Sequence, residues 1–79
     1  MLEFIKELEL MCVEERFKKD GSGSYIMVTV LGDTGKTLDV KYNGPVIDWS
    51  KFKPRQKYNF TFNYVDGRYS YLNVVGISA

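Results

Sequence analysis

Strict alternation of aromatic and polar residues over positions 57–65 constrains the fold of this chain more than any other feature. The stretch reads KYNFTFNYV, with rings at Tyr58, Phe60, Phe62 and Tyr64 and polar residues between them. Side chains of a β-strand alternate between two faces, so this period predicts a strand with all four rings on one face. Asp-Gly follows, and then a second run, RYSYLNVVGIS at 68–78. Asp-Gly between two such runs predicts a β-hairpin with a tight two-residue turn.

Two further strands are predicted upstream, from SYIMVTVLGD at 24–33 and KTLDVKYNG at 36–44. Both are apolar at alternate positions, and they flank a Gly-Asp-Thr-Gly turn, which indicates a second hairpin. Residues 44–56 hold both prolines and do not alternate, so they are predicted to form a connector. One helical turn is expected from Asp48 to Phe52, with Asp48 as its N-cap and Pro54 preventing its continuation.

Residues 2–19 fit either a helix or a strand. Leu2, Ile5, Leu8 and Cys12 fall at helical spacing, whereas Leu8, Leu10 and Cys12 also alternate with polar or flexible residues. We favour a long first strand over about residues 7–18. Four strands would leave two open sheet edges and too little core, whereas a fifth strand lets the sheet close. The expected fold class is all-β, a five-stranded barrel forming a single domain over residues 1–79, with a short helical turn or loop between the third and fourth strands.

The residue types argue against several classes of function. The sequence has no histidine and one cysteine, which removes the commonest general base, the commonest metal ligand and any internal disulfide. Cys12, between apolar neighbours, is interpreted as a small buried hydrophobe. We therefore expect no enzyme activity, no cofactor and no metal. No apolar run reaches transmembrane length, and the acidic start is unlike a signal peptide, so a cytoplasmic protein without a membrane partner is expected.

Charge is distributed unevenly along the chain, although the net charge is only +1. Residues 1–15 hold five acids and one lysine, and residues 16–79 hold ten bases and five acids. The run KFKPRQK at 51–57 has four bases and no acid. A locally basic surface favours a polyanionic partner regardless of the total charge.

Two stretches carry a resemblance to a known fold family. FKKDGSGSYIMVTVLGDTGKTLDVKYNG resembles the first three strands of OB-fold domains that bind nucleic acid, with a Lys-rich loop before an aromatic-led strand and an Asp-x-Thr-Gly turn. KYNFTFNYVDGRYSYLNVVGIS resembles their last hairpin. The likeness covers about residues 7–78, and among OB-fold proteins the chain is similar to the compact single-stranded-DNA-binding proteins of bacteriophages and mobile elements.

The resemblance implies which side chains fill the core and which face a ligand. The inward side chains would be Ile26, Val28, Val30, Leu38, Val40, Phe60, Phe62, Leu72 and Val74. OB-folds bind nucleic acid across the second and third strands, between the loops after strand one and before strand five. The expected nucleic-acid-binding residues are Phe17, Lys18, Lys19, Tyr25, Met27, Lys36, Lys41, Arg68, Tyr69 and Tyr71. In this interpretation Tyr69, Tyr71 and Asn73 face outward on the last strand, and Phe17 lies in the first loop.

Each of these assignments has a structural alternative. The outward tyrosines could simply pair across strands and cover the sheet. Trp49 in the connector could plug the open end of the barrel beside Phe52, or it could contact a ligand. The basic run at 51–57 could be a solvated surface or a second path for phosphates.

The expected function is binding of single-stranded DNA with little sequence preference, in phage or mobile-element replication or recombination. A small β-barrel that docks a partner protein is the alternative, and an RNA-binding OB domain is a further one. One small domain covers few nucleotides, so a homodimer or higher oligomer is expected, joined through the apolar start MLEFI.

Overall fold

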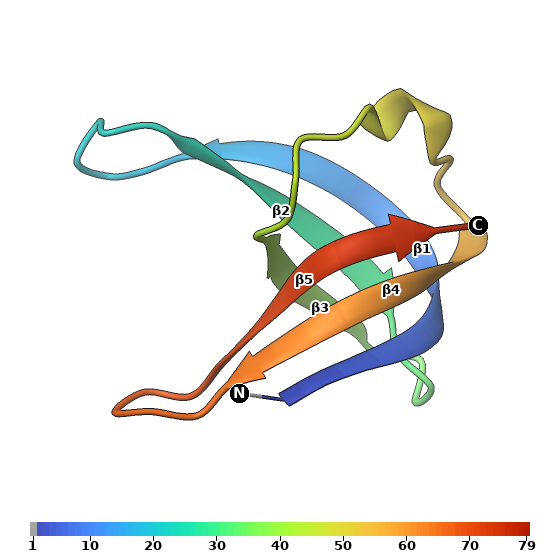
Figure 1. The fold of residues 1–79 in the computed structure, drawn as a ribbon. Coiled ribbons are helices and arrows are strands. Elements are labelled where there is room, and N and C mark those ends of the chain that lie inside the picture. The colour runs from blue at the N-terminus through green and yellow to red at the C-terminus, as the bar shows by residue number, and fades with distance from the viewer. Residues whose placement is uncertain (1) are drawn as a thin grey trace.

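Five strands and one short turn of 3₁₀ helix make up the ordered elements of residues 2–79, the part of the chain that the computed structural model describes (Figure 1). They are β1 (Leu2–Phe17), β2 (Ser24–Leu31), β3 (Thr37–Tyr42), η1 (Trp49–Lys51), β4 (Gln56–Val65) and β5 (Tyr71–Ser78). The strands form one sheet in the order β1-β2-β3-β5-β4, and β4 pairs with β1 to close the ring. The predicted all-β class is confirmed. Over the described residues, no helix is long or apolar enough to cross a membrane.

The first segment is a strand rather than a helix, and it begins at Leu2 instead of near residue 7. β1 pairs with β4 through residues 2–10 and with β2 through residues 9–17, so one strand belongs to both halves of the ring. A β-bulge between Leu10 and Cys12 lies where the partner changes. Bulges bend a strand and increase its twist, and this bend lets β1 curve around the ring.

The bulge also reverses the alternation of β1. Leu8 and Leu10 point into the core, but beyond the bulge Val13 packs against the core instead. Cys12 is therefore exposed, and its interpretation as a buried hydrophobe is wrong. One extra residue moves every later side chain of a strand to the other face, and a regular period of two could not reveal this shift.

The core consists of the inward side chains of all five strands. Its buried members are Leu8, Leu10, Val28, Val30, Val40, Tyr42, Tyr58, Phe60, Phe62 and Val74. Ile26 and Leu72, also predicted inward, are partly buried against this cluster. Leu38 was predicted to be buried but is 47% exposed. β3 pairs with β5 only at Lys41 and Tyr42, so no strand is paired with the first half of β3 on that side.

Asn73 is the opposite case, because it was predicted outward and is only 7% exposed. It lies where β5 crosses between two neighbours, with Lys41 of β3 on one side and Asn63 of β4 on the other. β5 therefore has a paired strand on each side at Asn73, and these neighbours shield its side chain from solvent.

The turn between β4 and β5 is longer than the predicted Asp-Gly pair. It spans residues 66–70, and the Ser70 hydroxyl donates a hydrogen bond of 3.2 Å to the Asp66 carboxylate. Arg68 and Tyr69 therefore lie in a loop. The prediction that Tyr69 and Tyr71 share one strand face is wrong, because β5 begins only at Tyr71.

The connector folds as the sequence predicts. The Asp48 carboxylate accepts hydrogen bonds from the Ser50 backbone nitrogen at 3.1 Å and from its hydroxyl at 2.6 Å, which caps η1. The Trp49 ring meets the Tyr42 ring edge-on at 4.9 Å and the Phe52 ring at 6.0 Å. These contacts agree with the interpretation of Trp49 as a plug at one end of the ring.

Candidate nucleic-acid interface

The outward side chains of β1, β2 and β3 form rows across the sheet, because opposite residues of antiparallel strands share a face. Met27 lies between Glu14 of β1 and Lys41 of β3. Thr29 lies opposite Asp39 in the same way. Tyr25 lies opposite Arg16 at the end of β2. The predicted face of Tyr25, Met27 and Lys41 is thus assembled by the register of three strands, and we call it the sheet face.

Tyr25 and Lys41 are coupled directly. The Lys41 amine lies over the Tyr25 ring, 5.3 Å from its centroid, and the ring itself is half-buried. A cation at this distance is attracted by the negative face of the ring. A flat base stacked on such a ring would bring its phosphate within reach of the lysine, so the pair can serve both parts of a nucleotide.

Two carboxylates interrupt the positive charge of the sheet face. Arg16 donates to Glu14 at 3.3 Å and lies 3.8 Å from Asp39, which also accepts a 2.6 Å hydrogen bond from Thr29. The hydrogen bond to Glu14 and its negative charge raise the pKa of Arg16 above its ordinary value, and the charge of Asp39 adds a smaller increase. Arg16 is therefore occupied by acids of its own chain. The basic excess after residue 15 did not reveal this local balance.

A groove of about 390 Å³ opens beside the sheet face, under the start of the connector. Its lining residues are Lys18, Ser24, Tyr25, Ile26, Lys41, Tyr42, Asn43, Gly44, Val46, Ile47 and Trp49. Three of these are aromatic and two are lysines, and no acidic residue is among them. The groove thus brings together Lys18, Tyr25 and Lys41 of the predicted set.

The connector wall of this groove was missed by sequence reasoning, which assigned no binding role to Asn43, Val46 or Ile47. The wall is held by Tyr42, whose hydroxyl donates a 2.6 Å hydrogen bond to the Pro45 carbonyl, and burial raises the pKa of this hydroxyl. A side chain at Gly44 would place its Cβ 2.3 Å from the Val75 carbonyl oxygen of β5. The glycine at position 44 is the one feature of the sequence that could have indicated how closely the connector passes over β5.

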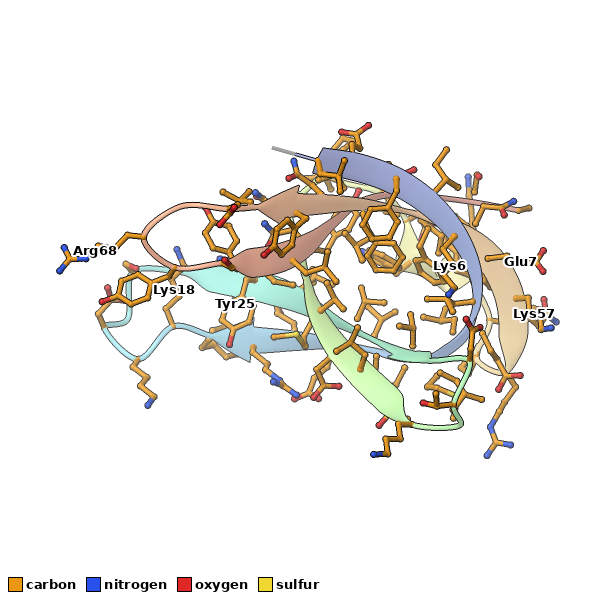
Figure 2. All side chains as sticks on the ribbon, turned by 90° about the horizontal axis from the view of Figure 1, so that it is seen from below. Lys6, Glu7, Lys18, Tyr25, Lys57 and Arg68 are labelled. Carbon is orange, nitrogen blue, oxygen red and sulfur yellow. The ribbon has the colours of Figure 1, made fainter. Side chains whose placement is uncertain are left out.

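The loops at residues 18–23 and 66–70 project from the same side of the ring (Figure 1). Figure 2 shows Lys18, Tyr25 and Arg68 toward the same side of the molecule, and Figure 1 shows that the two loops are well separated there, with the 66–70 loop near the start of β1. Arg68 lies over the Tyr69 ring, 5.9 Å from its centroid, and both Tyr69 and Tyr71 are exposed. We call these two segments the paired loops.

The first of the paired loops is a compact turn. Lys18 and Gly23 are joined by a backbone hydrogen bond of 2.9 Å, and Asp20 accepts a bond of 2.9 Å from the Ser22 backbone. Hydrogen bonding from Ser22 lowers the pKa of Asp20 below its usual value. Phe17, expected in this loop, is instead the last residue of β1, and its ring is exposed. It still borders the loop that carries Lys18 and Lys19.

Other predicted cations lie away from this end. Lys36 is in the loop between β2 and β3, at the opposite end of β2 from Lys18, so the two cannot serve one compact site. Lys57, at the end of the basic run, lies opposite Glu9 in the β1–β4 register. Lys51, Lys53 and Arg55 are exposed on the connector. Residues 2–79 contain no group of three or more acids and cysteines that could hold a metal ion.

No protein-family model, curated protein or solved structure matches this chain. The assignment of function therefore depends on the chemistry of the sheet face, the groove and the paired loops.

Proposed function

We propose that this chain binds single-stranded DNA with little sequence preference, as a small OB-fold protein acting in phage or mobile-element replication or recombination. The observation that carries the proposal is the groove with two lysines, three aromatic rings and no acid, continuous with the sheet face through Tyr25 and Lys41. Stacking on rings tolerates any base, because every base has a flat π-face, and lysines contact the phosphates that all nucleotides share. Neither contact selects a sequence.

The paired loops extend this surface. Tyr69, Tyr71 and Phe17 are exposed rings in or next to these loops, and Lys19 and Arg68 of the same loops add charge. Bases of a single strand can splay onto such rings, whereas a stacked duplex hides its bases from them. The proposal therefore includes a preference for single strands over duplex DNA.

A titration of intrinsic fluorescence tests the proposal, since Trp49 lines the groove and is the only tryptophan. Oligo(dT) should quench or shift its emission at low salt, and duplex DNA of equal length should compete poorly. The logarithm of the affinity should fall with the logarithm of salt concentration by about 0.7 for each phosphate contact.

Two lysines of one loop provide a matched pair. Lys18→Ala removes a cation that lines the groove, whereas Lys19→Ala removes its neighbour, which does not. Lys18→Ala should weaken binding of oligo(dT) more than Lys19→Ala. Absence of binding to oligo(dT) at low salt refutes the proposal, and tighter binding of oligo(rU) than oligo(dT) reassigns the chain to RNA.

A further inference from the structure

The opening of the ring between the first half of β1 and the β2–β3 loop is apolar. A groove of about 220 Å³ lies there, lined by Phe4, Lys6, Leu8, Gly32, Asp33, Leu38, Phe62 and Leu72. Phe4 stacks on Phe62 with ring centroids 5.2 Å apart, yet remains substantially exposed, as do Leu2 and Leu38. We call this the end groove. Figure 2 views the molecule from this side, with Lys6 pointing across the opening.

A free backbone edge borders the end groove. Residues 2–8 of β1 pair with β4 on one side, but the pairing with β2 on the other side starts only at Glu9. Opposite them, residues 37–40 of β3 pair with β2 and not with β5. Unpaired backbone donors and acceptors at a sheet edge are a template for an added strand. The groove between these edges is therefore suited to an extended chain, whose alternate side chains would enter it.

One exposed ion pair crosses the groove, between Lys6 of β1 and Asp33 of the β2–β3 loop. The two side chains are 48% and 69% exposed, and ion pairs in such positions contribute little to stability. An entering strand can open this pair at small cost. Asp33 would then join Glu3 and Glu7 of β1 as an acid beside the edge, against the single cation Lys6.

These charges disfavour a second copy of β1 as the occupant. If two β1 edges pair antiparallel around a twofold axis at Ile5, Glu3 of each copy lies opposite Glu7 of the other. This arrangement creates two pairs of like charges. An axis through Lys6 sets the two lysines opposite each other, and an axis through Phe4 sets Glu3 diagonal to acids of the copy. Like charges at these positions destabilise a strand pair. A strand with basic residues opposite Glu3 and Glu7 would instead be stabilised by opposite-charge pairs at these positions.

We propose that the end groove binds an extended peptide with apolar residues at alternate positions and lysine or arginine between them. The peptide would add as a strand to the free edge of residues 2–8. Its apolar side chains would lie over Phe4, Leu38 and Phe62, and its bases would pair with Glu3 and Glu7. This site is at the opposite end of the molecule from the groove of Lys18 and Lys41, so it does not depend on the proposed binding of DNA.

Binding of designed peptides to the full chain, measured by calorimetry and by amide chemical shifts, tests this proposal. The probe is a capped peptide of alternating valine and lysine, about as long as the free edge. It should shift the amides of residues 2–8 and bind roughly tenfold more tightly than the same peptide with glutamate for lysine, as expected for two or three cross-strand charge pairs. Two further peptides carry N-methyl groups, one at the odd and the other at the even backbone nitrogens. At least one of them should fail to bind, because alternate N–H groups face the same strand edge.

Leu38→Lys and Thr37→Lys form a matched pair of variants. Both add one cation to an exposed position of β3, but only Leu38 lines the end groove. Leu38→Lys should lower the affinity for the valine–lysine peptide about tenfold, and Thr37→Lys should change this affinity by less than about twofold. Equal binding of a peptide with the same residues in non-alternating order, or equal affinity of the two variants, overturns the proposal. A dimer that forms without peptide and is lost in Leu38→Lys also overturns it and assigns the groove to a second copy.

Discussion

Replacing Phe60 by alanine should remove a large fraction of the stability of this protein. The Phe60 side chain is fully buried and its ring centroid lies 6.2 Å from that of Phe62. A buried aromatic side chain removes about 150–250 Å² from water, which at about 25 cal/mol per Å² corresponds to roughly 4–6 kcal/mol. Phenylalanine-to-alanine changes in cores cost about 3–5 kcal/mol. A chain of this length has a total unfolding free energy of about 4–12 kcal/mol, so the variant should lose at least about a quarter of it.

Urea unfolding followed by Trp49 emission and by far-UV circular dichroism measures this loss, with Tyr71→Ala as the outward control. Tyr71 is 54% exposed, so its removal should change the unfolding free energy by within about 0.5 kcal/mol. Phe60→Leu keeps most of the volume and should remain folded if the alanine variant does not. A loss below about 1 kcal/mol for Phe60→Ala, or equal losses for both alanine variants, would refute the assignment of faces on β4 and β5.

Three further predictions concern the connector. Gly44→Ala should lower the unfolding free energy by roughly 1–3 kcal/mol, measured in urea, because its Cβ would meet the β5 backbone and the connector would have to shift. Tyr42→Phe should cost about 1 kcal/mol in the same assay, since it removes one hydrogen bond to the connector. Hydrogen bonds from Ser50 lower the folded-state pKa of Asp48. The stabilisation from this cap is therefore fully present above the ordinary aspartate pKa, and it is lost as the pH falls through the lowered pKa. Trp49 emission should change over that acidic range in the native chain, whereas Asp48→Ala should lack this step.

The strands were predictable from the sequence because their side chains alternate and Gly- or Pro-containing segments separate them. The same pattern predicted most of the core, from Val28 and Val30 to Phe60 and Val74, which the structure buries completely or nearly so. The capped turn at Asp48 was also predictable, since a cap depends on neighbours in sequence. These features are local, and local preferences agree with the final fold here.

The misplaced residues all depend on which strands meet in space. Cys12 is exposed because of a bulge, and Leu38 is exposed because β3 pairs with β5 at only two residues. Asn73 is buried where β5 pairs with both β3 and β4. The approach of Arg16 to Asp39 of β3 likewise requires the register of three strands, whereas Glu14 lies two residues from Arg16 in β1. Counting charges along the chain could not show which bases already have acidic partners.

The bulge in β1 makes this protein convenient to label. Cys12 is the only cysteine, and the extra residue before it turns its thiol out toward solvent in the row of Thr29 and Asp39. A maleimide dye attached there would sit one row from Met27 and Lys41 without entering the core. A single chemical step thus yields a uniformly tagged chain, whose dye can report energy transfer to a labelled oligonucleotide or to a labelled peptide at the far end.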